Sequence, residues 1–198
     1  MSWIKIIKYI DAGPALKKIY DRIKGPNNYI DNVFLAQSLR PRTLKGHIAL
    51  YKNTIHNPNN SLPTWYLEAV GVYISHLNGC NYCKQHHGAG FQRLYPDSDR
   101  APLYLEAVKA GTIDTFFEGK YLLGIDYAKQ LTIAPGTITQ TNIKDLRTGG
   151  FSDEEILELN QVIAYFNYGN RTSLGLGASL DNDILGTAPE EIKVTSDK

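Results

Sequence analysis

Apolar residues recur at intervals of three and four positions along most of this chain, and this spacing constrains the fold more than any other feature. Such intervals place side chains on one face of an α-helix, whereas a half-buried strand needs strict alternation of apolar and polar residues. No convincing series of alternating segments bounded by turns is present. The sequence therefore predicts an all-α fold.

The periodic segments also predict where the helices lie. Segments rich in Pro, Asn and Gly separate several of them, for example at 57–60 and 134–136. Ser152 and Glu155 have the spacing of a capping box ahead of the last long helix. The expected helices are Gly13–Ile23, Ile30–Ser38, Thr43–Ile55, Thr64–Leu77, Cys80–Leu94, Ala101–Ala110, Gly119–Leu131, Thr141–Arg147 and Ser152–Phe166, with further turns after Gly169.

A length of 198 residues allows one domain with a sizeable core, and we predict a single unit over residues 1–198. Its last segment, about 186–198, is polar enough to be a frayed tail or an arm onto a neighbouring subunit.

An internal comparison points to a duplicated helical hairpin. One shift of the sequence against itself lays Asn167 and Asn170 over the two cysteines of the chain. A helix, a short break and a second helix then recur at about 62–94 and about 150–180, although any two amphipathic helix pairs can align in this way. Because the second copy lacks thiols, we expect Asn167 and Asn170 to have structural roles.

Composition and charge exclude several classes of function. Hydrophobic residues make up 42% of the chain and charged residues 21%, and the formal net charge is +1. This charge produces no field strong enough to gather nucleic acid or an anionic membrane. Lysines interrupt the apolar N-terminal stretch, and no run of roughly 18 apolar residues occurs. We therefore predict a cytoplasmic protein without nucleic-acid or membrane partners.

Cys80 and Cys83 are the only cysteines and lie three positions apart. In a reducing cytosol such a pair is redox-active or metal-binding, because a structural disulfide would close a longer loop. Asn78 and Gly79 are expected to break the preceding helix and cap the next, which places Cys80 in its first turn. The positive end of the helix dipole favours the thiolate, which is the nucleophilic form of cysteine.

Two further residues make this pair a candidate catalytic site. His87 lies four residues beyond Cys83, on the same helical face, and can take or pass the thiol proton directly or through one water. Glu68 lies on the preceding helix, which on folding back could bring the carboxylate to His87. A carboxylate there would orient the ring and stabilise its charged form. The alternative is that Glu68 is a solvated residue of an amphipathic helix.

Zinc binding is the main alternative role for the cysteine pair. His87 and one further histidine would complete a tetrahedral set of ligands. Structural zinc sites usually supply a second close ligand pair, and the remaining histidines form none, so we predict no bound metal. Those histidines are His47, His56, His76 and His86.

The spacing of the candidate site resembles a known family signature. The string Glu68-x11-Cys80-x2-Cys83-x3-His87 is similar to that of the AhpD-like alkylhydroperoxidases, in the carboxymuconolactone decarboxylase superfamily. The similarity covers nearly the whole chain and points to the branch called peroxidase-related enzymes. Beyond the signature, the segments that carry it are 31–34, 38–41, 77–83, 86–89, 126–132 and 165–171.

This resemblance implies an AhpD-like helical fold and a role for each site residue. Cys83 would attack the peroxide, Cys80 would resolve the resulting sulfenic acid into a disulfide, and His87 with Glu68 would relay the proton. We further predict a homo-oligomer without a bound cofactor, whose disulfide is reduced by an external dithiol or a thioredoxin-like partner. One departure is Tyr82, where the founding peroxidases have a histidine, so we expect proton handling or substrate choice to differ from theirs.

The sequence as a whole favours a thiol-dependent peroxidase that reduces hydrogen peroxide or organic hydroperoxides. The sequence leaves two alternative functions open. A decarboxylase like the other superfamily branch leaves the cysteine pair without a role. A non-catalytic binding protein, stabilised by zinc or sensing redox state through the pair, would contain stoichiometric metal or change its assembly on oxidation.

Overall fold

The computed structural model describes residues 2–186, and within this range every regular element is a helix. The all-α prediction is therefore confirmed. The α-helices are α1 (Pro14–Tyr20), α2 (Asn32–Leu35), α3 (Pro41–Thr54), α4 (Thr64–Leu77), α5 (Asn81–Leu94), α6 (Ala101–Ala110), α7 (Gly119–Ile133), α8 (Gln140–Thr148) and α9 (Asp153–Leu176). The short 3₁₀ helices are η1 (Tyr9–Asp11), η2 (Pro26–Asn28), η3 (Ile113–Thr115) and η4 (Pro135–Thr137).

The predicted bounds are correct for α4 and α6 and too long for α2. The α2 segment was expected to cover Ile30–Ser38 but is a single turn. Asp31 has ψ 139°, outside the helical region, so the helix begins only at Asn32. Arg40, which precedes a proline, has φ −133° and ψ 75°, as expected for a residue whose helical conformation the proline ring disfavours.

The predicted second hairpin is wrong, because α9 continues through the expected break to Leu176. Its N-terminus has the predicted capping box between Ser152 and Glu155. Asn167 fits within the helix because its Nδ2 donates to the Ile163 carbonyl one turn earlier, at 3.0 Å. Gly177 caps the end of the helix, and its φ of 67° suits a residue without a side chain.

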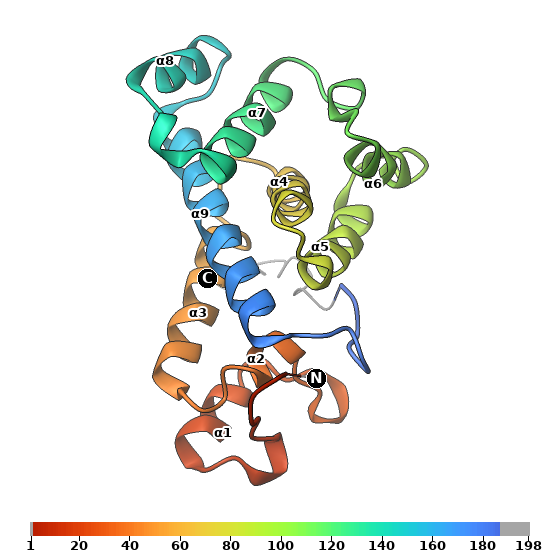
Figure 1. Cartoon of the computed structure of the whole chain (residues 1–198), viewed down its shortest axis with the longest axis vertical. Coiled ribbons are helices and arrows are strands. Elements are labelled where there is room, and N and C mark those ends of the chain that lie inside the picture. The colour runs from red at the N-terminus through yellow and green to blue at the C-terminus, as the bar shows by residue number, and fades with distance from the viewer. Residues whose placement is uncertain (1, 187–198) are drawn as a thin grey trace, which may run out of the picture.

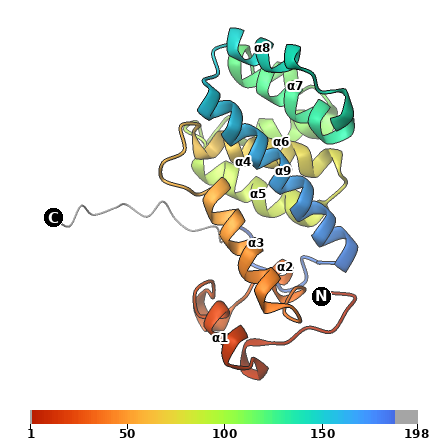
Figure 2. The same ribbon diagram turned by 90° about the vertical axis from the view of Figure 1, so that its left-hand side faces the viewer.

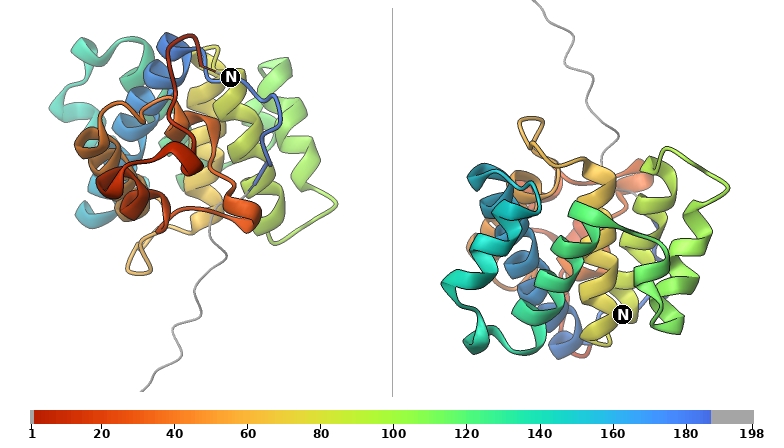
Figure 3. Two further views of the ribbon diagram at one scale, coloured as in Figure 1. Left: turned by 90° about the horizontal axis from the view of Figure 1, so that it is seen from below. Right: turned by 90° about the horizontal axis from the view of Figure 1, so that it is seen from above.

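α4 lies at the centre of the main core, surrounded by α5, α6, α7 and α9 (Figure 1; Figure 3, right). Residues 66–75 of this helix are all buried, which is the pattern of a helix enclosed on every side. Gly71 permits the close approach of α9, because a Cβ there would lie 1.9 Å from a ring carbon of Phe166. This contact sets the distance between α4, which carries Glu68, and α9, which lines the pocket beside Cys83.

A second apolar cluster joins the N-terminal helices to the rest of the chain. Leu16 and Tyr20 of α1 pack with Phe34 of α2 and with Leu44 and Ile48 of α3. α3 in turn packs on α9, with α1 at one end of the molecule and α8 at the other (Figure 2). This arrangement places residues of α2 and α3 beside Cys83, which is far from them in the sequence.

The chain after α9 runs back across the N-terminus of α5 (Figure 1; Figure 3, left). We call residues 178–186 the C-terminal strap. The predicted tail lies, apart from Gly186, outside the described residues. None of the helices described is both long and apolar enough to cross a membrane.

Candidate active site

The cysteine pair lies at the junction of α4 and α5. Gly79 has φ 70°, a conformation that glycine adopts readily, and it reverses the chain between the two helices. Cys80 is the N-cap of α5 rather than a residue of its first turn, so the predicted register was one residue too early. Its Sγ accepts a hydrogen bond from the backbone N–H of Cys83 at 3.4 Å. The first sulfur therefore caps the helix that carries the second.

Both thiols are free and almost completely covered. Cys80 is 1% exposed and Cys83 is 7% exposed. Val33 packs against them from one side, and Ala178 and Leu180 of the strap pack against them from another. The surface of the molecule thus offers little direct access to either sulfur.

The surroundings of the two sulfurs shift the pKa values of the two thiols in opposite directions. The hydrogen bond from the Cys80 thiol is the largest influence lowering the pKa of Cys83, and burial opposes it. The Ser173 hydroxyl and the charge of His87 lower this pKa further. The same hydrogen bond, together with burial, raises the pKa of Cys80. Cys83 is therefore the sulfur that ionises first, and Cys80 remains a thiol beside it.

Ser173 and Asn170 of α9 belong to the surroundings of Cys83, although the sequence did not single them out for chemistry. Cys83 Sγ lies 3.5 Å from Ser173 Oγ, and the Asn170 side chain is a further hydrogen-bond partner of this sulfur. A thiol donates to the serine hydroxyl, whereas a thiolate accepts from it, so one contact serves both states. The spacing of three between these residues signals a shared helical face.

The predicted contact between Glu68 and His87 is present. His87 Nδ1 lies 2.6 Å from Glu68 Oε2, across the interface of α4 and α5. The carboxylate has 0% exposure, and Gly90 of α5 leaves the space it occupies, since a Cβ there would lie 3.2 Å from Glu68 Cδ. Burial lowers the pKa of His87, but the charge and hydrogen bond of Glu68 outweigh burial and raise it.

The other carboxylate oxygen, Glu68 Oε1, has no hydrogen-bond partner among the described residues. His56 approaches it, with Nε2 at 3.7 Å, and the same nitrogen lies 2.9 Å from Tyr51 Oη. Burial lowers the pKa of His56, so this ring is neutral over a wider pH range than His87. The carboxylate therefore pairs with one histidine and only approaches the other.

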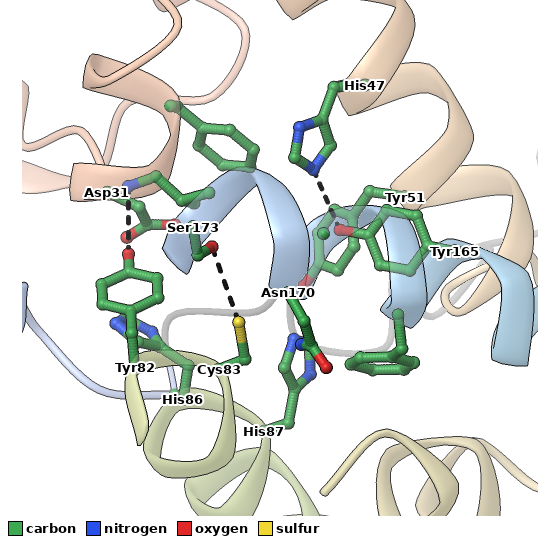
Figure 4. A pocket seen from close by; sticks show the side chains of 15 residues that line it. Asp31, His47, Tyr51, Tyr82, Cys83, His86, His87, Tyr165, Asn170 and Ser173 are labelled. Atoms are coloured by element: carbon green, nitrogen blue, oxygen red, sulfur yellow. Dashed lines mark hydrogen bonds between the residues drawn. The ribbon is translucent and has the colours of Figure 1, made fainter. Parts of the chain in front are cut away.

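A pocket of about 60 Å³ opens beside Cys83 (Figure 4). The lining contains Cys83 and His87 and does not contain Cys80. Aromatic side chains form much of its wall, including Phe34, Tyr165 and Phe166. The Phe166 ring stands edge-on to the His87 ring, with 4.5 Å between the ring centres. Within residues 2–186, no hydrogen bond joins Cys83 to His87, so the two groups influence each other through charge.

His47 forms a buried polar chain on the far wall of the pocket. Its Nδ1 contacts the Gln37 side chain at 2.8–3.0 Å. Its Nε2 lies 3.1 Å from Tyr165 Oη (Figure 4). Burial lowers the pKa of His47 to about 4, so the ring is neutral. This chain was not predicted, because its members come from three separate segments, namely the turn after α2, α3 and α9.

Three of the four further histidines considered as zinc ligands have other partners. His47 bonds Gln37 and Tyr165, His56 bonds Tyr51, and His86 Nε2 lies 3.1 Å from Asp183 Oδ2. In the part of the chain that the structure describes, no group of three or more His, Cys, Asp or Glu side chains is placed to hold a metal ion.

The hydroxyl of Tyr82, the departure from the family signature, bonds to groups other than the sulfurs. Its Oη donates to Asp183 Oδ2 at 2.6 Å and accepts from the Val33 N–H at 3.2 Å. The side chain that replaces the signature histidine therefore ties α5 to the C-terminal strap.

No protein-family model matches the chain, and no curated protein matches its sequence. Solved structures do match its fold. The alkylhydroperoxidase AhpD core of an uncharacterized peroxidase-related protein from Ralstonia eutropha JMP134 matches with a TM-score of 0.80 and 20% identity, over 96% of this chain and 98% of that one. An uncharacterized peroxidase-related protein from Silicibacter sp. TM1040 matches with a TM-score of 0.70 and 22% identity, over 90% and 94%.

A third match is a cysteine-to-alanine variant of the debrominase Bmp8 in complex with 2,3,4-tribromopyrrole. Its TM-score is 0.68 at 16% identity, over 92% of this chain and 95% of that one. These likenesses confirm that the chain has the AhpD-like helical fold, as the sequence predicted.

Proposed function

We propose that this chain is a thiol-dependent peroxidase in which Cys83 is the attacking sulfur. The observation that carries the proposal is the different placement of the two cysteines. Cys83 lines the pocket together with His87, whereas Cys80 is 1% exposed and is not part of the lining. A peroxide that enters the pocket therefore meets Cys83 first.

In the first step, the Cys83 thiolate attacks one oxygen of the peroxide and the O–O bond breaks. The bonding electrons leave with the second oxygen, which takes the proton held by His87 and departs as alcohol or water. That proton came from the Cys83 thiol, so the step is balanced, and the sulfur becomes a sulfenic acid. Glu68 supports this step because its charge stabilises the protonated ring of His87.

In the second step, Cys80 attacks the sulfur of the sulfenic acid and the S–O bond breaks. The proton of Cys80 leaves with the oxygen as water, and a disulfide forms. The raised pKa of Cys80 suits this order, because it remains a thiol until the sulfenic acid forms. An external dithiol then returns two electrons and two protons by thiol–disulfide exchange.

A thiol titration combined with intact mass tests the proposal. The reduced protein is treated with hydrogen peroxide, tert-butyl hydroperoxide or cumene hydroperoxide, and free thiols are counted before and after. We expect both thiols to disappear together and the mass to fall by two hydrogens with at least one of these oxidants. Thiols that survive all three under native conditions would contradict the proposal.

A second candidate function is thiol-dependent debromination of a small aromatic ring. The observation that favours it is the aromatic wall beside Cys83, formed by Phe34, Tyr165 and Phe166, since flat rings pack well against aromatic faces. The debrominase neighbour was solved with a brominated pyrrole. Removal of bromine as bromide, with a proton added to the ring, takes two electrons, which the two thiols supply by forming a disulfide.

Measurement of bromide release separates the two functions. The reduced protein is incubated with 2,3,4-tribromopyrrole, and bromide and remaining thiols are quantified together. One bromide released for two thiols lost supports debromination. Thiol loss with peroxides but not with the bromopyrrole supports the peroxidase.

A further inference from the structure

The C-terminal strap covers the cysteine pair. Ala178 and Leu180 pack on Cys80, Tyr82 and Cys83, which form one small apolar cluster. The strap then continues to Gly186, which contributes to the lining of the pocket. The low exposure of both sulfurs therefore depends partly on a segment that belongs to no helix.

One carboxylate fastens this segment. The Asp183 side chain is 1% exposed, and its oxygens accept hydrogen bonds from Tyr82 Oη at 2.6 Å and from the Tyr29 hydroxyl. His86 Nε2 lies 3.1 Å away, and the Asn32 backbone N–H lies 3.3 Å from both oxygens. Burial raises the pKa of Asp183, but the hydrogen bonds of its three side-chain partners outweigh burial and lower it. The group is therefore a carboxylate at neutral pH.

Several further contacts of the strap use its backbone. Asn32 Nδ2 donates to the carbonyls of Ser179 at 2.9 Å and Asp181 at 3.1 Å. The Ile184 N–H donates to Tyr29 Oη at 2.7 Å, and the Arg93 side chain donates to the Gly186 carbonyl. The Asp183 side chain joins the strap both to α5 and to the Tyr29 loop.

The covering of the thiols affects the two halves of the proposed cycle differently. A small peroxide can reach Cys83 through the pocket that this residue lines. Reduction of the disulfide requires the sulfur of the reductant to approach a protein sulfur directly, so access limits its rate. A protein dithiol presents its sulfur on a broad surface, which cannot reach sulfurs that are 1% and 7% exposed.

We propose that Asp183 is a specificity-determining residue that selects the reductant by size. With the strap fastened, a compact dithiol reaches the disulfide through the pocket, and a protein-sized dithiol is excluded until the strap is released. This inference rests on the proposed redox cycle, but the covering of the thiols can be measured without any peroxide.

Alkylation of the reduced protein measures the covering directly. Iodoacetamide serves as the small probe, and a maleimide carrying a long polyethylene glycol chain serves as the bulky probe. In Asp183→Ala we expect the bulky probe to react at least about tenfold faster than in the parent. The loss of a hydrogen bond to a charged group should shift the equilibrium between the fastened and the released strap by about this factor. The rate with iodoacetamide should change less than about threefold, which corresponds to a smaller free-energy change than the loss of one such hydrogen bond.

Two further variants keep this test specific to the strap. Tyr29→Phe removes one donor to Asp183 and the acceptor for the Ile184 N–H without altering α5, and it should also accelerate the reaction of the bulky probe. Asp114→Asn, on the exposed surface of η3, removes an equal charge and should leave both rates unchanged. Equal acceleration of both probes, no acceleration, or the same effect in Asp114→Asn would overturn the assignment.

A reduction experiment then tests the selection itself. The disulfide is formed with diamide, so that its formation does not depend on peroxidase activity, and is reduced by dithiothreitol or by thioredoxin. Asp183→Ala should increase the rate with thioredoxin at least about tenfold relative to the rate with dithiothreitol, matching the alkylation result. A parent protein that thioredoxin reduces as fast as the variant would overturn the proposal, whatever the outcome of the peroxide assay.

Discussion

Gly90 faces the carboxylate of Glu68, so that a Cβ at position 90 would lie only 3.2 Å from Glu68 Cδ. This glycine lets the buried carboxylate reach His87 Nδ1 at 2.6 Å. The pairing that governs the charge of His87 thus depends on the absence of a side chain on the next turn of α5.

Gly90→Ala should alter the chemistry of the site more than the stability of the fold. Replacing a helical glycine by alanine stabilises a helix by about 1 kcal/mol, which offsets a contact that displaces Glu68 by a few tenths of an ångström. The weaker pairing should raise the pH midpoint for alkylation of Cys83. Gly88→Ala is the matched control, because its Cβ would meet Leu105 at an ordinary 3.5 Å. An unchanged midpoint in Gly90→Ala would contradict this account of the pairing.

Glu68→Gln should raise the pH at which Cys83 becomes reactive. Glu68 raises the pKa of His87, so without its charge His87 loses its proton at lower pH. The positive charge that lowers the pKa of Cys83 is then absent near neutral pH, and that pKa rises. We expect the midpoint of single-turnover oxidation to move up by roughly one unit, within the range of a lost opposite charge. An identical pH profile would remove the glutamate from the relay.

Gly71→Ala should destabilise the fold where α4 meets α9. The new methyl group would overlap the Phe166 ring, which is 1% exposed and cannot move aside freely. Overpacking of this kind costs about 1–3 kcal/mol, and urea unfolding measures it. Gly175→Ala, at a position of α9 with nothing within 4 Å, should instead gain up to about 1 kcal/mol. Equal stability of the two variants would show that α4 and α9 are not in close contact.

The expectation of a homo-oligomer remains a prediction. Exposed apolar side chains on α3 and α9, namely Leu50, Leu157 and Leu174, are available to a symmetric helical interface. Light scattering should give a multiple of the 22.1 kDa chain mass. A monomer mass over a wide range of concentrations would count decisively against an oligomer.

The helical part of the fold could be predicted from local spacing. α4 was correct to the residue because its apolar residues repeat on every face between a proline and Asn78. The continuity of α9 could not be predicted, because Asn167 resembles a helix breaker until its side chain is seen bonded to the Ile163 carbonyl. The prediction of a second helical hairpin at about 150–180 was wrong for the same reason.

The candidate site was predictable where its members lie close in sequence. The spacing of Cys83 and His87 indicated a shared face, and the Glu68 pairing required only that α4 fold back on α5. The strap was not predictable, because Tyr82 and Asp183 are 101 positions apart and nothing local marks them as partners. Asn170 was assigned a structural role by the failed alignment, although it lies in the wall of the thiol pocket.

The central claim is that Cys83 attacks and Cys80 resolves, and single-turnover oxidation of two variants tests it most directly. Cys83→Ser should lose peroxide consumption, because serine supplies no thiolate and Cys80 lies outside the pocket lining. Cys80→Ser should still be oxidised once, and its sulfenic acid on Cys83 should persist and be trapped by dimedone, as intact mass and peptide mapping would show. A trapped sulfenic acid on Cys80 in the Cys83→Ser protein would contradict the account and reverse the two roles.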